Sequence, residues 1–424
     1  MREYLKKLPQ EMQELLYLFS DIASRDNMPI YLVGGIVRDL ILGVNNLDLD
    51  IVVEGDGIKF AERCASVLKV RFIRHSRFGT ATLIVNPNLK VDVATARRES
   101  YPEPASLPVV TPGALRDDLG RRDFTINAMA ISIIKTDFGR LVDFFGARID
   151  LLHGRIRILH VLSFIDDPTR ILRAIRFEKR YNFRIETETL SCLKEANRLK
   201  MLEQVQPHRL RDELILALKE REPIRQIKRI QELVGFTFLC PRLGVSQATH
   251  KYLYSIRRCV DWMKKNYPQR RELDVWLIYL MGLIDSLSLK DTRVICGKFA
   301  FPRGDEKRIL GFKQLKPAFI RELRESGLKP SRIFGLLEPL SYEVIILIKA
   351  KYKNRHLQKN VEDFFEIYNG MRVFICGDDL RRMGIAPGPR YKKIFTRVLK
   401  EKLEGKIKTK EQELALMRKM IKGR

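Results

Sequence analysis

Two aspartates separated by one residue, Asp48 and Asp50, end the stretch "GGIVRDLILGVNNLDLD". Residues two apart in a β-strand point to the same face, so this spacing predicts two carboxylates side by side. Like charges at that separation are unfavourable unless a cation lies between them. Carboxylate oxygens suit Mg²⁺, whose remaining positions are filled by water and substrate phosphates. An exposed edge strand would show the same pattern, and the neighbouring residues decide between the two interpretations.

The residues that precede the aspartates favour the metal interpretation. Gly34 and Gly35 follow a short apolar run that predicts a strand, and glycine lets the backbone approach a phosphate closely. The next residues, "IVRDLIL", predict a helix whose first N–H groups attract anions, and Arg38 adds a charged donor. Together with Asp48 and Asp50, these residues predict a site for a nucleoside triphosphate and its metal ion.

A second motif, "RRDFTINAMA" at 121–130, carries further groups of the same kind. Arg121 and Arg122 are candidate phosphate or charge partners. Asp123 is a candidate acceptor for a ribose hydroxyl, and Asn127 follows one turn later. We therefore add this segment to the predicted nucleotide site.

A third motif, "DDPTRILRAIRF" at 166–177, places charged residues three apart. Asp-Pro is typical of a helix start, and side chains three apart on a helix form a stripe along one side. Asp167, Arg170, Arg173 and Arg176 would lie on that stripe. An acidic and several basic groups so arranged can hydrogen-bond a base edge and neutralise phosphates. A salt-bridged surface helix has the same spacing, so the interpretation depends on the other motifs.

The order of predicted elements indicates a mixed α/β region followed by helices. An amphipathic helix is predicted within the first 30 or so residues, and helices continue from residue 151 to the end. Between them we predict short strands at 31–35, 48–55, 70–76, 79–85 and 90–96, a helix at 57–68, a long loop at 97–118 and a helix at 121–133.

The charge is strongly positive and unevenly distributed. The chain has 79 Lys and Arg against 52 Asp and Glu, a formal net charge of +27. Residues 1–100 hold 14 basic and 13 acidic side chains, whereas residues 351–424 hold 20 basic and 9 acidic. A nearly neutral front end joined to a basic remainder indicates a chemical module attached to a module that binds a polyanion.

Other features indicate a reducing cytoplasm and no membrane. The apolar runs are shorter than the ~20 residues that a membrane span needs. The N-terminal residues lack a signal-peptide pattern. The six cysteines include no CxxC pair, which argues against a zinc site and a disulfide framework.

The motifs GGxVRD, DxD, RRDFTxNAMA and DPxRxLRAxRF, in this order, resemble those of the class II tRNA nucleotidyltransferases. This family belongs to the DNA polymerase β-like superfamily and includes CCA-adding enzymes and bacterial poly(A) polymerases. The segment "GDDLRRMGIAPGPRYKKIF" is similar to the tail of tRNA-processing members. The resemblance implies an α+β chain with a small mixed β-sheet in a catalytic head at 1–150, followed by an all-α neck at 151–225, body at 226–350 and tail at 351–424.

The resemblance also implies roles for individual residues. Asp48 and Asp50 would hold two Mg²⁺ ions, and Asp92 is a candidate third carboxylate. The substrates would be CTP and ATP, and the basic neck, body and tail would bind the acceptor and TΨC arm of tRNA. Asp167 and Arg170 would pair with the edge of C or A. Gly34, Gly35, Arg38, Arg122, Asp123 and Asn127 would contact the nucleotide, and Arg173 and Arg176 would hold phosphates or support the base-reading pair.

Within the family, addition of the complete CCA end is the leading prediction and addition of the terminal A alone is the next. The loop at 97–118 is full length, with Arg98 and Glu99 as a candidate basic–acidic latch, which disfavours CC-only addition. A poly(A) polymerase is a further alternative. A different class, an RNA-binding protein that has lost activity, is disfavoured by the intact Asp48 and Asp50.

Overall fold

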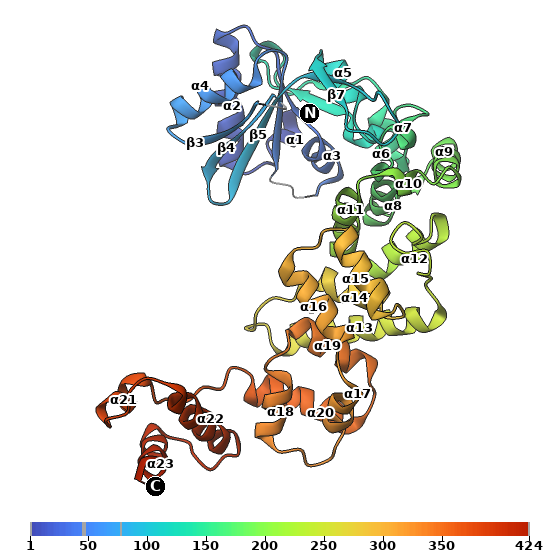
Figure 1. Ribbon diagram of the computed structural model, residues 1–424. Coiled ribbons are helices and arrows are strands. Elements are labelled where there is room, and N and C mark those ends of the chain that lie inside the picture. The colour runs from blue at the N-terminus through green and yellow to red at the C-terminus, as the bar shows by residue number, and fades with distance from the viewer. Residues whose placement is uncertain (1, 45–47, 77–78, 423–424) are drawn as a thin grey trace. The chain divides into compact units, whose positions relative to one another are not determined.

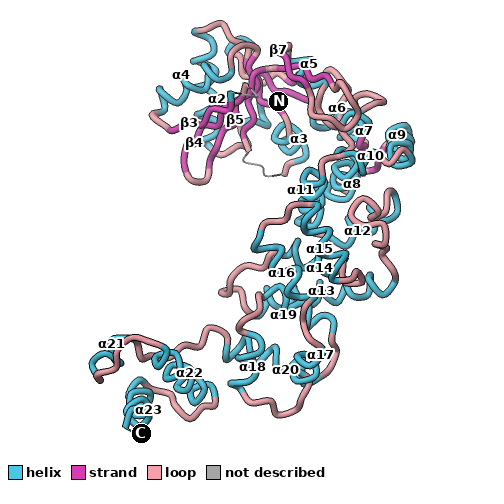
Figure 2. Tube along the Cα trace, viewed as in Figure 1, coloured by secondary structure: helices cyan, strands magenta, loops and turns pink. Residues whose placement is uncertain are grey.

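The computed structural model describes residues 2–44, 48–76 and 79–422 (Figure 1). The chain forms two compact units, residues 1–238 and 239–424. The first contains a β-sheet and the second consists of helices and loops over its described residues (Figure 2). The predicted α+β class, a mixed sheet followed by helices, is confirmed.

The sheet of the first unit has seven strands in the order β3-β4-β5-β2-β1-β8-β9. The pairing of β2 with β5 is parallel, and the other pairings within this sheet are antiparallel. The strands predicted between residues 31 and 96 are present as β1 to β5. The strands are β1 (Ile30–Val33), β2 (Leu49–Val53), β3 (Arg71–His75), β4 (Thr80–Asn86), β5 (Leu89–Thr95), β8 (Met129–Ser132) and β9 (Leu141–Asp143).

Helix α4 (Gly57–Leu68) packs on β3, β4 and β5 and occupies the residues predicted for it. Asp56 caps it, because its Oδ1 accepts hydrogen bonds from the N–H groups of Ile58 and Lys59. The buried face of α4 includes Phe60, which meets Phe19 edge to face. Phe19 belongs to α2 (Gln10–Arg25), the predicted N-terminal helix, and the short α1 (Arg2–Leu5) precedes it.

The prediction of a helix at 121–133 is wrong. The segment forms a single 3₁₀ turn, η2 (Thr125–Asn127), and then strand β8, which pairs with β1 and β9. Every residue of β8 is buried, and its first three residues, Met129 to Ile131, are apolar without alternation. A short apolar run of this kind fits a buried helix or a buried strand equally, and only its neighbours in the sheet decide.

The loop predicted at 97–118 is more regular than expected. It contains a two-stranded hairpin, β6 (Arg97–Ser100) with β7 (Val109–Pro112), and then the start of α5 (Leu115–Gly120). The connection between the hairpin strands is held to α7 (Ser163–Asp166) by a hydrogen bond from Ala105 N–H to the carbonyl of Ile165. The hairpin is therefore positioned by contacts at its tip as well as at its base.

The rest of the first unit is mostly helical. Helix α8, which carries the predicted charged stripe, packs against α11 and α12. The parallel pair β10 (Arg155–Ile156) and β11 (Arg184–Ile185) and a short 3₁₀ turn, η3 (Lys135–Asp137), complete the unit. The helices are α6 (Ala147–Leu152), α7 (Ser163–Asp166), α8 (Thr169–Tyr181), α9 (Thr187–Arg198), α10 (Met201–Gln204), α11 (Pro207–Lys219) and α12 (Pro223–Leu233).

In the second unit, two largely buried helices, α14 and α19, pack with α13 at the centre. The C-terminal helices α21, α22 and α23 share a small core. The elements are α13 (Gln247–Asn266), α14 (Val275–Leu283), α15 (Leu289–Lys298), α16 (Arg303–Lys313), α17 (Pro317–Leu323), α18 (Pro330–Leu337), α19 (Tyr342–Lys351), α20 (Arg355–Asp363), the π-helical segment η4 (Phe364–Tyr368), α21 (Gly377–Arg382), α22 (Pro389–Leu403) and α23 (Lys410–Lys422).

Two further expectations concern the whole chain. Among the described residues, no helix combines the length and the apolar character that crossing a membrane requires. The division at Phe238 and Leu239 assigns residues 226–238 to the first unit, although the sequence prediction assigned them to the body. The finer boundaries between head, neck, body and tail remain predictions.

Candidate active site

A cleft of about 780 Å³ in the first unit brings the predicted motifs together. It is bordered by the turn between β1 and α3 (Gly35–Leu42), by the start of β2, by the hairpin strand β6 and by helices α8 and α11. Twelve of the predicted site residues line it: Gly34, Gly35, Arg38, Asp48, Asp50, Arg122, Asp123, Asn127, Asp167, Arg170, Arg173 and Arg176.

The glycine turn at the sheet end of the cleft is tightly enclosed. Gly34 has φ +82°, a conformation that side-chain-bearing residues rarely adopt. A Cβ atom at this position would lie 3.0 Å from Nη1 of Arg122 and 3.1 Å from Oδ2 of Asp50. The turn therefore leaves room beside the carboxylate only because residue 34 is glycine.

Asp50 sits among other acidic groups at the same end of the cleft. Asp48 directly precedes β2, and Asp50 is opposite Asp92 of the parallel strand β5. Burial, together with the charges of Asp92 and Asp48, raises the pKa of Asp50 to about 6, although the charge of Arg122 lowers it. Arg122 forms its ion pair with the buried Asp118, at 3.1 Å, rather than with Asp50. The negative charge of Asp50 is therefore only partly compensated.

The chemistry of this edge fits a hard divalent cation. Two carboxylates approach from one strand, and the glycine turn leaves an open approach beside Asp50. Within the described residues, no group of three or more His, Cys, Asp or Glu side chains is arranged to hold a metal ion. Mg²⁺ bound through one or two carboxylates, with substrate phosphates and water as its other ligands, requires no such group. Asp92 does not line the cleft; Thr82 donates a hydrogen bond to its Oδ1 at 2.5 Å.

Arg38 is placed by the first turn of α3 and is held by the protein itself. Its guanidinium donates to both carboxylate oxygens of Asp39, at 2.8 and 2.9 Å, and to Oδ1 of Asn127. It also lies 4.8 Å from the centre of the Tyr181 ring, and only 5% of the residue is exposed. The predicted contact between Arg38 and a nucleotide remains a prediction.

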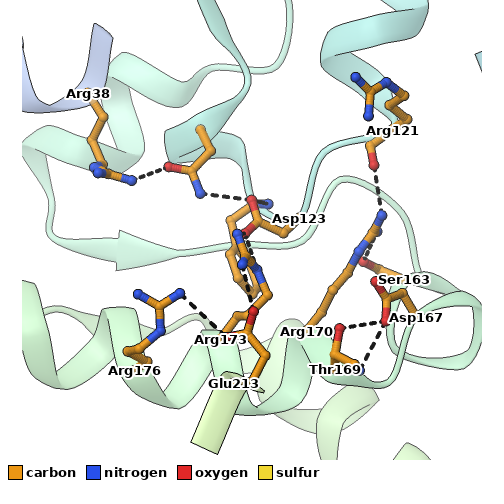
Figure 3. A network of polar contacts seen from close by, with 12 residues as sticks. Arg38, Arg121, Asp123, Ser163, Asp167, Thr169, Arg170, Arg173, Arg176 and Glu213 are labelled. Atoms are coloured by element: carbon orange, nitrogen blue, oxygen red, sulfur yellow. Dashed lines mark hydrogen bonds and ion pairs between the residues drawn. The ribbon is translucent and has the colours of Figure 1, made fainter. Parts of the chain in front are cut away.

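Asp123 is the centre of a buried polar chain (Figure 3). Its Oδ1 accepts hydrogen bonds from Nδ2 of Asn127 and from the N–H of Phe124, both at 2.8 Å. Its Oδ2 accepts from Nε and Nη2 of Arg173, at 2.9 and 2.7 Å. Burial raises the pKa of Asp123, but the charge of Arg173 and these hydrogen bonds outweigh burial and lower it to about 2.

This series of polar contacts continues from Asp123 into the helices. Nη1 of Arg173 donates to Oε1 of Glu213 at 2.8 Å, and Arg176 approaches the other oxygen of Glu213 at 3.4 Å (Figure 3). Arg173 and Arg176 belong to α8, and Glu213 belongs to α11. These ion pairs lock the helices to each other and to the segment after α5. The predicted phosphate contacts of the two arginines are not tested by this arrangement.

The predicted base-reading pair lies at the start of α8. Oδ1 of Asp167 accepts hydrogen bonds from the N–H and hydroxyl of Thr169 and from Nη2 of Arg209, at 3.1, 2.6 and 3.0 Å. Over the described part of the chain, the Oδ2 atom of Asp167 receives no hydrogen bond. Arg170 donates from Nη1 to Oγ of Ser163 and from Nη2 to the carbonyl of Arg121, both at 2.7 Å.

The hairpin contributes the wall of the cleft that faces this pair. Glu99 accepts from Arg97 and from Arg121, at 2.8 and 3.0 Å, and the Tyr101 hydroxyl donates to its other oxygen at 3.1 Å. Arg98 faces the opposite way along the strand and pairs with Asp117 at 3.0 Å. The two members of the predicted Arg98–Glu99 latch thus have separate partners.

Sequence reasoning missed several residues that hold the site: Asp118, Ser163, Arg209 and Glu213. Glu213 had a detectable signal. It lies three residues after Leu210 and four before Ala217, and so falls on the buried face of α11. A carboxylate on an apolar helix face needs a cationic partner. Ser163 had no such signal, because an isolated serine is common in any segment.

Known proteins resemble this chain along nearly its whole length. The family described as the Poly A polymerase head domain matches residues 30–157. The chain is 36% identical over 416 residues to the A-adding tRNA nucleotidyltransferase of Geobacter sulfurreducens, covering 97% of this chain and 47% of that protein. It is 32% identical over 431 residues to the A-adding tRNA nucleotidyltransferase of Halalkalibacterium halodurans, covering 98% of this chain and 94% of that protein. The chain therefore spans about half of the first relative and nearly all of the second.

Solved structures give the same result. The Thermotoga maritima CCA-adding enzyme complexed with tRNA is similar with a TM-score of 0.74 at 33% identity, covering 99% of this chain and 98% of that one. Complexes of a CCA-adding enzyme with ATP and with CTP are similar with TM-scores of 0.75 and 0.73, both at 33% identity. The former covers 98% of this chain and 97% of that one, and the latter 100% and 97%. With the motifs gathered in one cleft, these similarities show that the chain belongs to the class II tRNA nucleotidyltransferase family.

Proposed function

We propose that the protein adds the 3′-terminal CCA to tRNA from CTP and ATP, without a nucleic-acid template and with release of pyrophosphate. The observation that carries this proposal is the placement of Asp48 and Asp50 in the same cleft as Asp167 and Arg170. The first pair suits a metal-bound triphosphate, and the second suits a base edge. A nucleoside triphosphate of ordinary size is the ligand that needs both.

The reaction is an in-line transfer in which the tRNA 3′-oxygen bonds to the α-phosphorus and pyrophosphate leaves. Asp48 and Asp50 would hold two Mg²⁺ ions, which supply activation of the hydroxyl and neutralisation of the leaving group when they are bound. Gly34 and Gly35 would leave space for the phosphates, and Arg122 would add positive charge beside them. Catalysis then rests on orientation and charge compensation, and no covalent enzyme intermediate is required.

The helix end of the cleft would select the base. C and A each present an amine donor beside a ring-nitrogen acceptor, whereas G and U present an acceptor beside an N–H donor. Asp167 has a carboxylate oxygen, Oδ2, that makes no hydrogen bond within the described residues, and Arg170 offers N–H donors. This pair complements C and A. Arg38, Asp123, Asn127, Arg173 and Arg176 are retained as nucleotide-site residues that also form the walls of the cleft.

The basic part of the chain is proposed to hold the RNA. Residues 351–424 carry 20 basic and 9 acidic side chains, and α22 alone contains Arg390, Lys392, Lys393, Arg397 and Lys400. Positive charge of this density binds a phosphate backbone with strong salt dependence. We assign tRNA, through its acceptor and TΨC arm, as the partner of the helical regions, and the cytoplasm as its compartment.

Addition of the terminal A alone is the second candidate. The observation in its favour is that both relatives described above are A-adding enzymes. The similar solved structures are CCA-adding enzymes at comparable identity, which supports the first candidate equally.

The test uses end-labelled tRNAs that stop at the discriminator base, at C or at CC. Each is incubated with Mg²⁺ and with CTP, ATP, GTP or UTP, alone and together. Extension of all three substrates to CCA is the expected result. Extension of only the CC-ended tRNA, by one A, would identify the A-adding enzyme instead. Long A-tracts would identify a poly(A) polymerase, and failure to extend any substrate would refute the enzymatic proposal in favour of an RNA-binding protein.

A further inference from the structure

The guanidinium of Arg170 is fixed at two points by hydrogen bonds to other parts of the protein (Figure 3). Nη1 donates to Oγ of Ser163 in α7, and Nη2 donates to the carbonyl of Arg121. Ser163 is completely buried, and Arg170 is 5% exposed although it lines the cleft. A guanidinium is planar, so two anchors determine the direction of its remaining N–H groups.

The carboxylate of Asp167 is fixed in a similar way. Three donors converge on its Oδ1: the N–H and hydroxyl of Thr169 and Nη2 of Arg209. Thr169 belongs to the same helix start, whereas Arg209 comes from α11. Oδ1 is therefore occupied within the protein, and the orientation of Oδ2 follows from it.

The order of acceptor and donor along the base edge is what separates C and A from G and U. A carboxylate can accept from the ring N–H of G or U, and a guanidinium can donate to the neighbouring carbonyl. The same two side chains in the reverse order would therefore fit the wrong bases. Discrimination thus requires that neither side chain be free to move toward the other's position.

We propose that Ser163 and Arg209 are positioning residues for nucleotide selection. Ser163 holds the guanidinium of Arg170, Arg209 holds the carboxylate of Asp167, and together they fix the order in which the pair meets a base. This inference rests on the proposed function, since it concerns the selectivity of that reaction.

The test is the ratio of kcat/KM for UTP to that for CTP, and for GTP to that for ATP, measured on tRNA substrates that the wild-type protein extends. Ser163→Ala removes the acceptor of a buried charged N–H, so the guanidinium reorients. We expect both ratios to rise by about tenfold or more, which corresponds to the loss of one such hydrogen bond. Ser163→Thr keeps the hydroxyl and is expected to keep the wild-type ratios.

The matched control is Ser132→Ala. Ser132 is equally buried, and its hydroxyl also bonds to a charged group, Asp137, but it lies near the other end of the sheet strand β8. A loss of stability alone would lower transfer of all four nucleotides together in both variants. Only a positioning role changes the ratios in Ser163→Ala and leaves them unchanged in Ser132→Ala.

Arg209→Gln tests the other half of the proposal and does not require a change in the core, since the Arg209 side chain is 23% exposed. The same rise in both ratios is expected, with Arg209→Lys closer to the wild type. If Ser163→Ala does not fold, Arg209→Gln decides alone. Wild-type ratios in folded Ser163→Ala and Arg209→Gln would overturn the inference. Absence of any transfer by the wild-type protein would instead refute the proposed function.

Discussion

Two aspartates in the same cleft have opposite electrostatic environments. Burial and the neighbouring carboxylates raise the pKa of Asp50 to about 6. Asp123 is buried more deeply, yet its pKa falls to about 2 because Arg173 and several hydrogen bonds outweigh the cost of burial. The difference lies in the neighbours and not in the residue type. A buried charge that the protein compensates holds structure together, whereas one left partly uncompensated indicates a place for a ligand.

The largest expected effect comes from removing a carboxylate at the sheet end of the cleft. Asp50→Ala and Asp48→Ala should lower nucleotide transfer by at least about a thousandfold, because metal-assisted charge stabilisation is worth several kcal/mol. Affinity for tRNA should stay near the wild-type value and should keep its salt dependence. Single-turnover transfer and filter binding at two salt concentrations measure both quantities.

Glu62→Ala is the control for this prediction, since Glu62 is an exposed acid of α4 with a long contact to Arg74. It should leave transfer unchanged. Near-normal transfer by Asp50→Ala would show that the sheet end of the cleft is not where the metal acts.

Removing the compensated charge should have the next largest effect, on stability. Asp123→Asn leaves the buried guanidinium of Arg173 with one partner fewer, and breaking a buried pair from one side typically costs about 3 kcal/mol. Denaturant unfolding measures the free energy of unfolding. The double variant Asp123→Asn/Arg173→Met should recover part of the loss, because no uncompensated charge remains at that point. A double variant less stable than Asp123→Asn would contradict this account.

Two glycine substitutions separate backbone strain from crowding of the site. Gly34 and Gly43 both have positive φ, +82° and +69°, but among the described residues no atom lies within 4 Å of a Cβ built on Gly43. Gly34→Ala and Gly43→Ala should each destabilise the fold by about 1–2 kcal/mol. Only Gly34→Ala should also reduce transfer, by about tenfold or more, because its Cβ meets Arg122 and Asp50. Thermal unfolding and transfer rates provide the two readouts. Equal losses of transfer in both variants would contradict the assignment of Gly34 to the phosphate site.

The smallest expected effect is the pH dependence that Asp50 gives to the free energy of unfolding. Since the pKa of Asp50 is raised from its ordinary 3.8 to about 6, the folded state binds more protons than the unfolded state between these values. Stability from this group therefore falls as pH rises toward 6. Asp50→Asn should be more stable than the wild type above pH 6, by about 1–2 kcal/mol, and nearly equal to it below pH 4.

Mg²⁺ provides the check on this pH effect. A cation bound at Asp50 compensates the carboxylate, so saturating Mg²⁺ should reduce the advantage of Asp50→Asn above pH 6. Titration with Mg²⁺ near pH 6 should also release protons from the wild type and not from the variant. A stability difference independent of Mg²⁺ would mean that the carboxylate is not a metal ligand.

The sequence predicted the sheet end of the cleft well and the helix end incompletely. The Gly34–Gly35 turn, the strand that carries Asp50 and the cap of α4 are set by residues within a few positions of each other. The pairing of Asp123 with Arg173 joins residues 50 positions apart, and that of Arg173 with Glu213 joins residues 40 apart. Such pairs depend on how strands and helices pack, which local patterns do not report.

The segment at 121–133 shows the same limit. Its apolar residues are compatible with a helix or with a strand that is buried on both faces, and the pairing of β8 between β1 and β9 decided for the strand. This choice also determines where Asp123 and Asn127 lie, because both precede the strand at the end that faces the cleft.

The sequence by itself determined which side chains share a face or a turn, because those relations follow from the periods of strand and helix. It therefore identified Asp48 with Asp50 and the stripe from Asp167 to Arg176. The tertiary structure alone decided which charges are compensated, because a partner is supplied by a distant element and its energy depends on burial and separation. Asp50 and Asp123 are the same residue type, but the folded chain pairs Arg173 directly with Asp123, whereas the arginine near Asp50, Arg122, pairs with Asp118.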